Sequence, residues 1–245
     1  MKARLILLPA LLLPLLAWGA EPPLFSSLAP GPVLPKEFRI ITLPKIARNQ
    51  FSLVADEGKT VLRVDSDNSA GSVGIPITAP PDTRGAGRTS GDASTRLEWR
   101  WKVSRVLERA EMEHKLSDDY AARVYVFFDV PLESLSFIDR SKIKIARMVA
   151  GADVPTAALC YVWDSNHRVG YTAWSPYTNR LRMVVLQSGP TRVGQWMSES
   201  RDVAADFREA FGFDAPAVTS VAVGNDTDNT DDRVTTWYGD ISFRK

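Results

Sequence analysis

Apolar and polar residues alternate along many short segments of this chain. Residues 97–103 are the clearest case, because Leu97, Trp99, Trp101 and Val103 occupy every second position and charged residues lie between them. Side chains of a strand point alternately to its two faces, so this segment is predicted to be a strand with one buried face. The same alternation predicts that both tryptophans lie in the core.

Further segments have the β-branched and aromatic composition of strands, and two segments have helical spacing instead. The predicted strands cover residues 51–54, 60–64, 73–77, 122–128, 159–163, 180–187, 218–224 and 235–243. Helices are predicted over residues 137–149 and 202–211, the second ending at Gly212, and residues 80–92 are predicted to be a surface loop. This pattern predicts a mainly β protein, a single jelly-roll-like β-sandwich with one or two short helices.

The N-terminus has the order of segments of a secretory signal peptide. Basic residues are followed by an apolar run over residues 5–16 and then by small residues, and Ala17 and Gly19 favour cleavage after Gly19. The run is shorter than the roughly 20 residues that span a bilayer, although a retained signal anchor is the alternative. The predicted organisation is therefore a signal peptide (residues 1–19), an extended segment (residues 20–36) and one β-sandwich domain (residues 37–245). It predicts a periplasmic or secreted protein without stable membrane insertion after cleavage.

The charge of the chain restricts its partners. Its 245 residues include 30 Lys and Arg and 29 Asp and Glu, which are interspersed. Because neutralising phosphates requires a dense basic surface, a nucleic-acid partner is excluded. The single cysteine, Cys160, rules out an intramolecular disulfide, and its apolar neighbours predict a buried thiol.

Several stretches spread over the chain together resemble one protein family. They are residues 99–103 (WRWKV), 118–126 (DDYAARVYV), 176–185 (PYTNRLRMVV), 201–207 (RDVAADF), 226–230 (DTDNT) and 237–241 (WYGDI). In residues and order they are similar to the family called domain of unknown function 3047. The resemblance implies an exported bacterial protein and implies no particular activity. Gly224 and Asn225 depart from it, since bulkier or more apolar residues are expected there.

An acidic segment, residues 226–232, lies between two predicted strands. Alternating carboxylates suit a hard cation such as calcium, although this segment lacks the glycine and glutamate of an EF-hand. The last strand also resembles the closing strand of jelly-roll carbohydrate-binding modules, which implies that Asp240 belongs to a structural calcium site. The predicted metal ligands are therefore Asp226, Asp228 and Asp240, and a solvated turn is the alternative.

Basic and aromatic side chains are predicted to line one open face of a sheet. Arg100 and Lys102 alternate with the tryptophans, and Arg123 and Tyr125 alternate with valines. Such a face suits a polyol or an acidic sugar, because aromatic rings pack on sugar C–H groups and arginine pairs with carboxylates. An ordinary solvated face with ion pairs is the alternative. The predicted ligand-binding residues are Arg100, Lys102, Asp118, Asp119, Arg123, Tyr125, Trp163, Trp174, Tyr177 and Arg182.

Motifs for catalysis are lacking in the sequence. It has no nucleophile elbow, P-loop or dinucleotide fingerprint, and His114 and His167 do not have the spacing of metal ligands. The favoured prediction is a non-catalytic carbohydrate- or glycan-binding protein of the cell envelope, with calcium as the one cofactor considered. One alternative is a polysaccharide-acting enzyme whose paired aspartates come from residues 118–119 and from Asp226 or Asp228, if these loops converge. Another is a protein-interaction module, which would expose an apolar patch.

Overall fold

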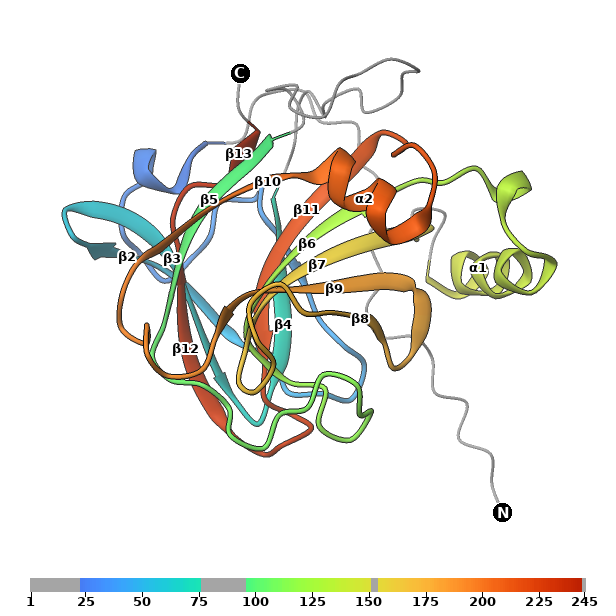
Figure 1. Cartoon of the computed structure of the whole chain (residues 1–245). Helices are drawn as coiled ribbons and strands as arrows, with labels where there is room; N and C mark the ends of the chain where they lie inside the picture. The colour runs from blue at the N-terminus through green and yellow to red at the C-terminus, as the bar shows by residue number, and fades with distance from the viewer. Residues whose placement is uncertain (1–22, 76–95, 151–153, 244–245) are drawn as a thin grey trace.

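The computed structural model describes residues 23–75, 96–150 and 154–243 (Figure 1). The signal peptide predicted for residues 1–19 and the loop predicted for residues 80–92 lie outside these ranges. Among the helices within them, none has the length and apolar character that crossing a bilayer requires.

Two mainly antiparallel sheets pack face to face in a sandwich. In order across the first sheet lie β1 (Arg39–Ile41), β4 (Ala70–Ile75), β11 (Val218–Asp226), β6 (Tyr120–Phe128), β7 (Ala157–Asp164), β9 (Thr178–Ser188) and β8 (Thr172–Ser175). In the second lie β10 (Met197–Asp202), β5 (Arg96–Val103), β12 (Arg233–Tyr238), β3 (Lys59–Asp67) and β2 (Gln50–Asp56), with β13 (Ser242–Phe243) also paired to β5. Strands that follow one another in the chain often belong to opposite sheets, as in jelly rolls. The predicted mainly β sandwich is confirmed.

Both predicted helices are present. Helix α1 (Phe137–Ala150) stands beside the sandwich and α2 (Val203–Phe211) lies across strand ends of the first sheet (Figure 1). Two short 3₁₀ turns, η1 (Phe25–Ser27) and η3 (Leu132–Ser134), complete the described helical elements. The carboxylate of Asp202 accepts a hydrogen bond from the Ala205 N–H at 3.1 Å, and Gly212 ends α2 with a φ of 78°. An N-cap aspartate and a left-handed glycine explain why α2 begins and ends at these residues.

The core between the sheets is rich in aromatic side chains. Trp99 and Trp101 point inward from β5, as predicted, and their rings lie 5.3 Å from Tyr161 and 6.1 Å from Trp163 of β7. Trp163 is 0% exposed, so the prediction that it lines an open ligand-binding face is wrong. The prediction failed because every residue of β7 is buried. A strand that is buried on both faces has no alternation of polar and apolar residues, so its sequence does not reveal which face points into the core.

A second apolar layer covers the outer face of the first sheet. Tyr125, Phe127, Cys160 and Met183 belong to it, and Met112 packs on them from the segment that connects β5 to β6. The predicted burial of Cys160 is confirmed.

The segment before β1 belongs to the folded domain from the first described residues onward. Phe25 of η1 is buried and stacks on Phe38 with ring centroids 5.1 Å apart. Gly31 and Leu53 exchange backbone hydrogen bonds of 2.9 and 2.8 Å. The described part of the segment predicted to be extended therefore packs against the second sheet and includes a 3₁₀ turn.

Candidate functional site

The predicted ligand-binding residues are divided between two surfaces. Arg100 and Lys102 belong to β5 of the second sheet, whereas Arg123 lies on β6 and Arg182 on β9 of the first sheet. The tryptophans of β5 face inward, and its basic residues alternate with them. Arg100 and Lys102 therefore lie on the outer face of the second sheet, which points away from the first sheet. The prediction of one common basic face is therefore wrong, because alternation within a strand does not reveal which sheet the strand joins.

Four predicted aspartates do converge, and we call Asp118, Asp119, Asp226 and Asp228 the aspartate cluster. The Asp119 carboxylate accepts hydrogen bonds from the Thr230 N–H and hydroxyl, both at 2.6 Å. Carboxylate oxygens of Asp119, Asp226 and Asp228 lie within 4.8 Å of one another. The two loops thus meet, as the enzyme alternative requires.

A buried arginine lies in the middle of the aspartate cluster. The Arg123 guanidinium pairs with the Asp226 carboxylate and donates hydrogen bonds of 2.7 Å to the Asp118 carbonyl and the Tyr125 hydroxyl. Its Cζ atom also lies 4.2 Å from the centre of the Tyr120 ring. Burial raises the pKa of Asp226, and the positive charge of Arg123 opposes that rise. Arg123 and Tyr125 therefore serve the interior of the fold.

Asp118 is the least satisfied member of the cluster. Its Oδ1 atom is buried and has no hydrogen-bond partner among the described residues. Burial raises the pKa of Asp118 to about 6, against the opposing charge of Arg123. Asp118 and Asp119 are only 7% and 1% exposed, so these two carboxylates face the protein and not solvent.

Asp240 lies far from the aspartate cluster. Asp226 lies next to the turn that precedes β12, and Asp240 follows its other end; the six residues of β12 rise about 3.3 Å each, so the two ends are roughly 20 Å apart. The Asp240 carboxylate instead accepts the Ser26 N–H at 2.9 Å and the Ser26 hydroxyl at 2.6 Å. The predicted grouping of Asp240 with Asp226 and Asp228 is wrong, and Asp119 takes its place beside them.

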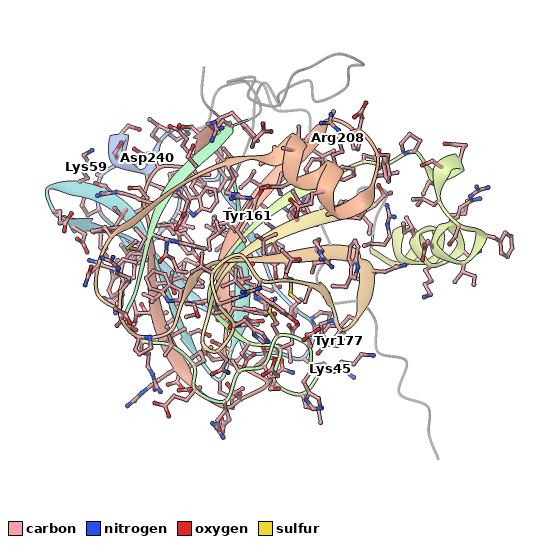
Figure 2. All side chains as sticks on the ribbon, in the orientation of Figure 1. Lys45, Lys59, Tyr161, Tyr177, Arg208 and Asp240 are labelled. Atoms are coloured by element: carbon pink, nitrogen blue, oxygen red, sulfur yellow. The ribbon has the colours of Figure 1, made fainter. Side chains whose placement is uncertain are left out.

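A pocket opens where the last predicted strand is interrupted. Residues 235–243 were expected to form one strand, but β12 ends at Tyr238 and β13 begins at Ser242. A Cβ atom on Gly239 would lie 2.5 Å from Cγ of Arg100, so the arginine can cross the bend only because this residue is glycine. The resulting Arg100 pocket has a volume of about 240 Å³ and is lined by Ser26, Lys59, Thr60, Trp99, Arg100, Ser198, Gly239 and Asp240. Figure 2 shows Lys59 and Asp240 at this end of the molecule, and Tyr177 at the other.

Two residues that line the pocket each have an unsatisfied hydrogen-bond donor. Trp99 Nε1 and Arg100 Nη2 are both buried without a partner in the described part of the chain. The Arg100 guanidinium lies 4.2 Å from the centre of the Trp196 ring, whose Nε1 atom donates to Asp56 at 3.2 Å. The sequence predicted Arg100 as a ligand-binding residue but not Trp196, because the loop that carries this tryptophan has no alternation of apolar and polar residues from which its orientation could be predicted.

Lys102 is held beside the pocket by contacts of its own. Its ammonium group pairs with Asp56 and lies 5.0 Å from the Trp196 ring and 4.8 Å from the Trp237 ring. Lys102 therefore keeps Asp56 and the two tryptophans in place and offers no free charge to a ligand.

A second pair of arginine and tryptophan lies on the first sheet. The Arg182 guanidinium is 4.9 Å from the centre of the Trp174 ring, which packs edge-on against Phe211 at 5.3 Å. Tyr177 is partly exposed, and its hydroxyl donates to the Lys115 carbonyl at 2.7 Å. These contacts hold the end of the first sheet together.

Comparisons with known proteins give a family and a distant structural likeness. A family model described as "Protein of unknown function (DUF3047)" matches residues 36–242. No curated protein matches the chain. The solved structures that match include the endoglucanase Cel12A from Rhodothermus marinus, with 11% identity, 87% of this chain and 94% of that chain covered, and a TM-score of 0.41. They also include a family 12 xyloglucanase from Bacillus licheniformis, with 9% identity, 87% and 95% covered, and a TM-score of 0.42. Similarities at this level say nothing about the activity of this chain.

Proposed function

The chain belongs to the DUF3047 family of proteins of unknown function, and we propose that it is a non-catalytic glycan-binding protein of the cell envelope. The ligand is an acidic sugar unit that enters the Arg100 pocket. The observation that carries this proposal is the unsatisfied Nη2 donor of Arg100, whose side chain lines the pocket. The envelope location rests on the predicted signal peptide.

The Arg100 donor defines the chemistry of the ligand. A buried donor without a partner costs about 1–3 kcal/mol, and an acceptor that reaches it removes this cost. A sugar carboxylate offers two acceptor oxygens and matches the guanidinium of Arg100.

Charges around the pocket favour an acidic sugar over a neutral one. Arg100 and Lys59 line it together with Asp240, whose carboxylate is held by two hydrogen bonds from Ser26, and the exposed Glu57 carboxylate lies 3.7 Å from Arg100. The Trp196 ring restrains the Arg100 guanidinium, which lowers the entropy that its ordering by a ligand would cost. Ser198 adds a hydroxyl that can exchange hydrogen bonds with sugar hydroxyls.

The aspartate cluster fits a structural role better than hydrolysis. A glycosidase needs two carboxyl groups that face a bound sugar, and Asp118 and Asp119 are almost fully buried. Asp119 uses its oxygens to hold the loop at Thr230, and Asp226 neutralises Arg123. We therefore assign the aspartate cluster a structural role, in which it holds the two loops together.

Native gels cast with polysaccharides test the proposal. We expect polygalacturonate or alginate to retard the protein, and dextran or methyl-esterified polygalacturonate to have little effect. Arg100→Met should abolish the retardation, and Trp196→Ala should weaken it. Arg182→Met and Trp174→Ala are matched controls, because they disrupt the similar pair on the other sheet and should retain binding.

Two results would overturn the glycan proposal. One is the absence of retardation by every acidic polysaccharide. The other is retardation that survives Arg100→Met, provided that thermal unfolding shows the variant to be folded.

A further inference from the structure

Outside the two sites described so far, one histidine and two glutamates meet on the surface. Glu111 and Glu113 come from the segment between β5 and β6, and His167 comes from the turn between β7 and β8. One potential ligand atom from each lies within 4.8 Å of the others. We call these three residues the His167 site.

We propose that the His167 site binds a divalent transition metal ion of the Zn²⁺ type. Nε2 of His167 lies 3.4 Å from Oε1 of Glu111. Two ligands bound to one tetrahedral zinc ion at about 2.0–2.1 Å are separated by about 3.3–3.4 Å. These two atoms thus already have the spacing of neighbouring zinc ligands.

A buried carboxylate orients the imidazole toward that position. Asp164 is 3% exposed, and its Oδ2 atom lies 3.2 Å from Nδ1 of His167. The same oxygen accepts the backbone N–H groups of Asn166 and His167 at 2.8 and 2.5 Å, so it is fixed in place. A proton held on Nδ1 by Asp164 leaves the lone pair of Nε2 facing Glu111. An imidazole that donates to a carboxylate through one nitrogen and binds the metal through the other is common in metal sites.

Tyr171 positions the third ligand. Its hydroxyl donates to Oε2 of Glu113 at 2.8 Å, and its ring stacks on the His167 ring with centroids 4.4 Å apart. One tyrosine therefore restrains both the glutamate and the imidazole, and the other oxygen of Glu113 stays available to an ion.

The ligand set indicates the class of metal. Imidazole combined with carboxylates suits zinc and its neighbours, whereas calcium prefers oxygen ligands alone. Three protein ligands would leave the fourth position of a tetrahedral ion to water, and Glu111 and Glu113 lie toward solvent.

The test uses Zn²⁺ alone as the probe and the purified whole protein. Isothermal titration calorimetry should show one site in the wild type and a loss of affinity of at least about tenfold in His167→Gln. The sequence has two histidines, so His114→Gln is the matched control and should bind as the wild type does. In NMR spectra, the imidazole signals of His167 should shift on addition of Zn²⁺ while those of His114 stay unchanged.

A positioning role for Asp164 has its own readout. Asp164→Asn keeps all three ligands and should weaken Zn²⁺ binding by about 10–100-fold, as outer-shell substitutions do. Absence of Zn²⁺ binding by the folded wild type, or equal binding by the wild type and His167→Gln, would overturn the proposal. The contacts of His167 with Asp164 and Glu111 would then serve only to hold the turn between β7 and β8. Neither result affects the glycan proposal, which depends on different residues.

Discussion

Replacing Asp118 by asparagine should stabilise the protein at neutral pH. The Asp118 carboxyl is buried, and its Oδ1 atom has no partner among the described residues. Asparagine has nearly the same shape and carries no charge, so it removes the cost of keeping an ionised carboxylate inside the fold.

The magnitude follows from proton linkage. Burial raises the pKa of Asp118 from 3.8 to about 6 in the folded protein. Between these values the folded state binds the proton and the unfolded state releases it, so stability falls as pH rises from about 4 to about 6. Since one pKa unit corresponds to 1.36 kcal/mol, the full loss above pH 6 is about 3 kcal/mol. Below pH 4 the variant and the wild type should have similar stability.

Urea unfolding at a series of pH values from 4 to 8 measures this difference. The free energies of unfolding of Asp118→Asn and the wild type should diverge as pH rises, with the variant higher by up to about 3 kcal/mol above pH 6. Asp119→Asn is the control and should destabilise the protein at neutral pH, because Asp119 accepts hydrogen bonds from Thr230 and Asn229. A pH-independent difference between Asp118→Asn and the wild type would refute the reasoning.

Other substitutions test the bends and the aspartate cluster. A Cβ on Gly224 would lie 2.2 Å from a backbone oxygen of β4, so Gly224→Ala should cost about 3 kcal/mol or more in urea unfolding. A Cβ on Gly239 would lie 2.5 Å from Cγ of Arg100, so Gly239→Ala should displace the Arg100 side chain, lower stability in urea unfolding and weaken polysaccharide retardation in native gels. Asp226→Ala leaves the buried Arg123 guanidinium without an acceptor at this position and should cost about 3–5 kcal/mol, with or without calcium. The predicted calcium site requires calcium to raise the melting temperature of the wild type but not of Asp228→Asn, and equal shifts would contradict it.

Alternation in the sequence predicted the strands well and their partners poorly. Residues 97–103 were recognised as a strand with inward tryptophans, because β5 has one apolar and one polar face. The same reasoning failed for Trp163, since β7 has no polar face. Pairing between β5 and β10 joins residues about 100 positions apart, and nothing local in either segment specifies it.

The candidate sites depended on details that become visible only in three dimensions. Convergence of the aspartates follows from the register of β6 with β11, where Tyr120 pairs with Asp226. Gly224 departs from the expected bulkier residue because the backbone of β4 passes too close for a side chain. Asn225 donates to the Thr236 hydroxyl at 2.9 Å within the core, which explains a polar residue at this position. The His167 site was missed because its ligands come from separate loops without a recognisable spacing.

The bond between Asp240 and Ser26 also bears on the order in which the molecule becomes functional. These residues are 214 positions apart, yet both line the Arg100 pocket. During synthesis from the N-terminus, Ser26 appears long before the bend at Gly239 that completes the opposite wall. A contact between such distant segments closes a long loop and tends to form late in folding. Competence to bind a ligand at this pocket would therefore require that the chain from Ser26 to Asp240 has folded.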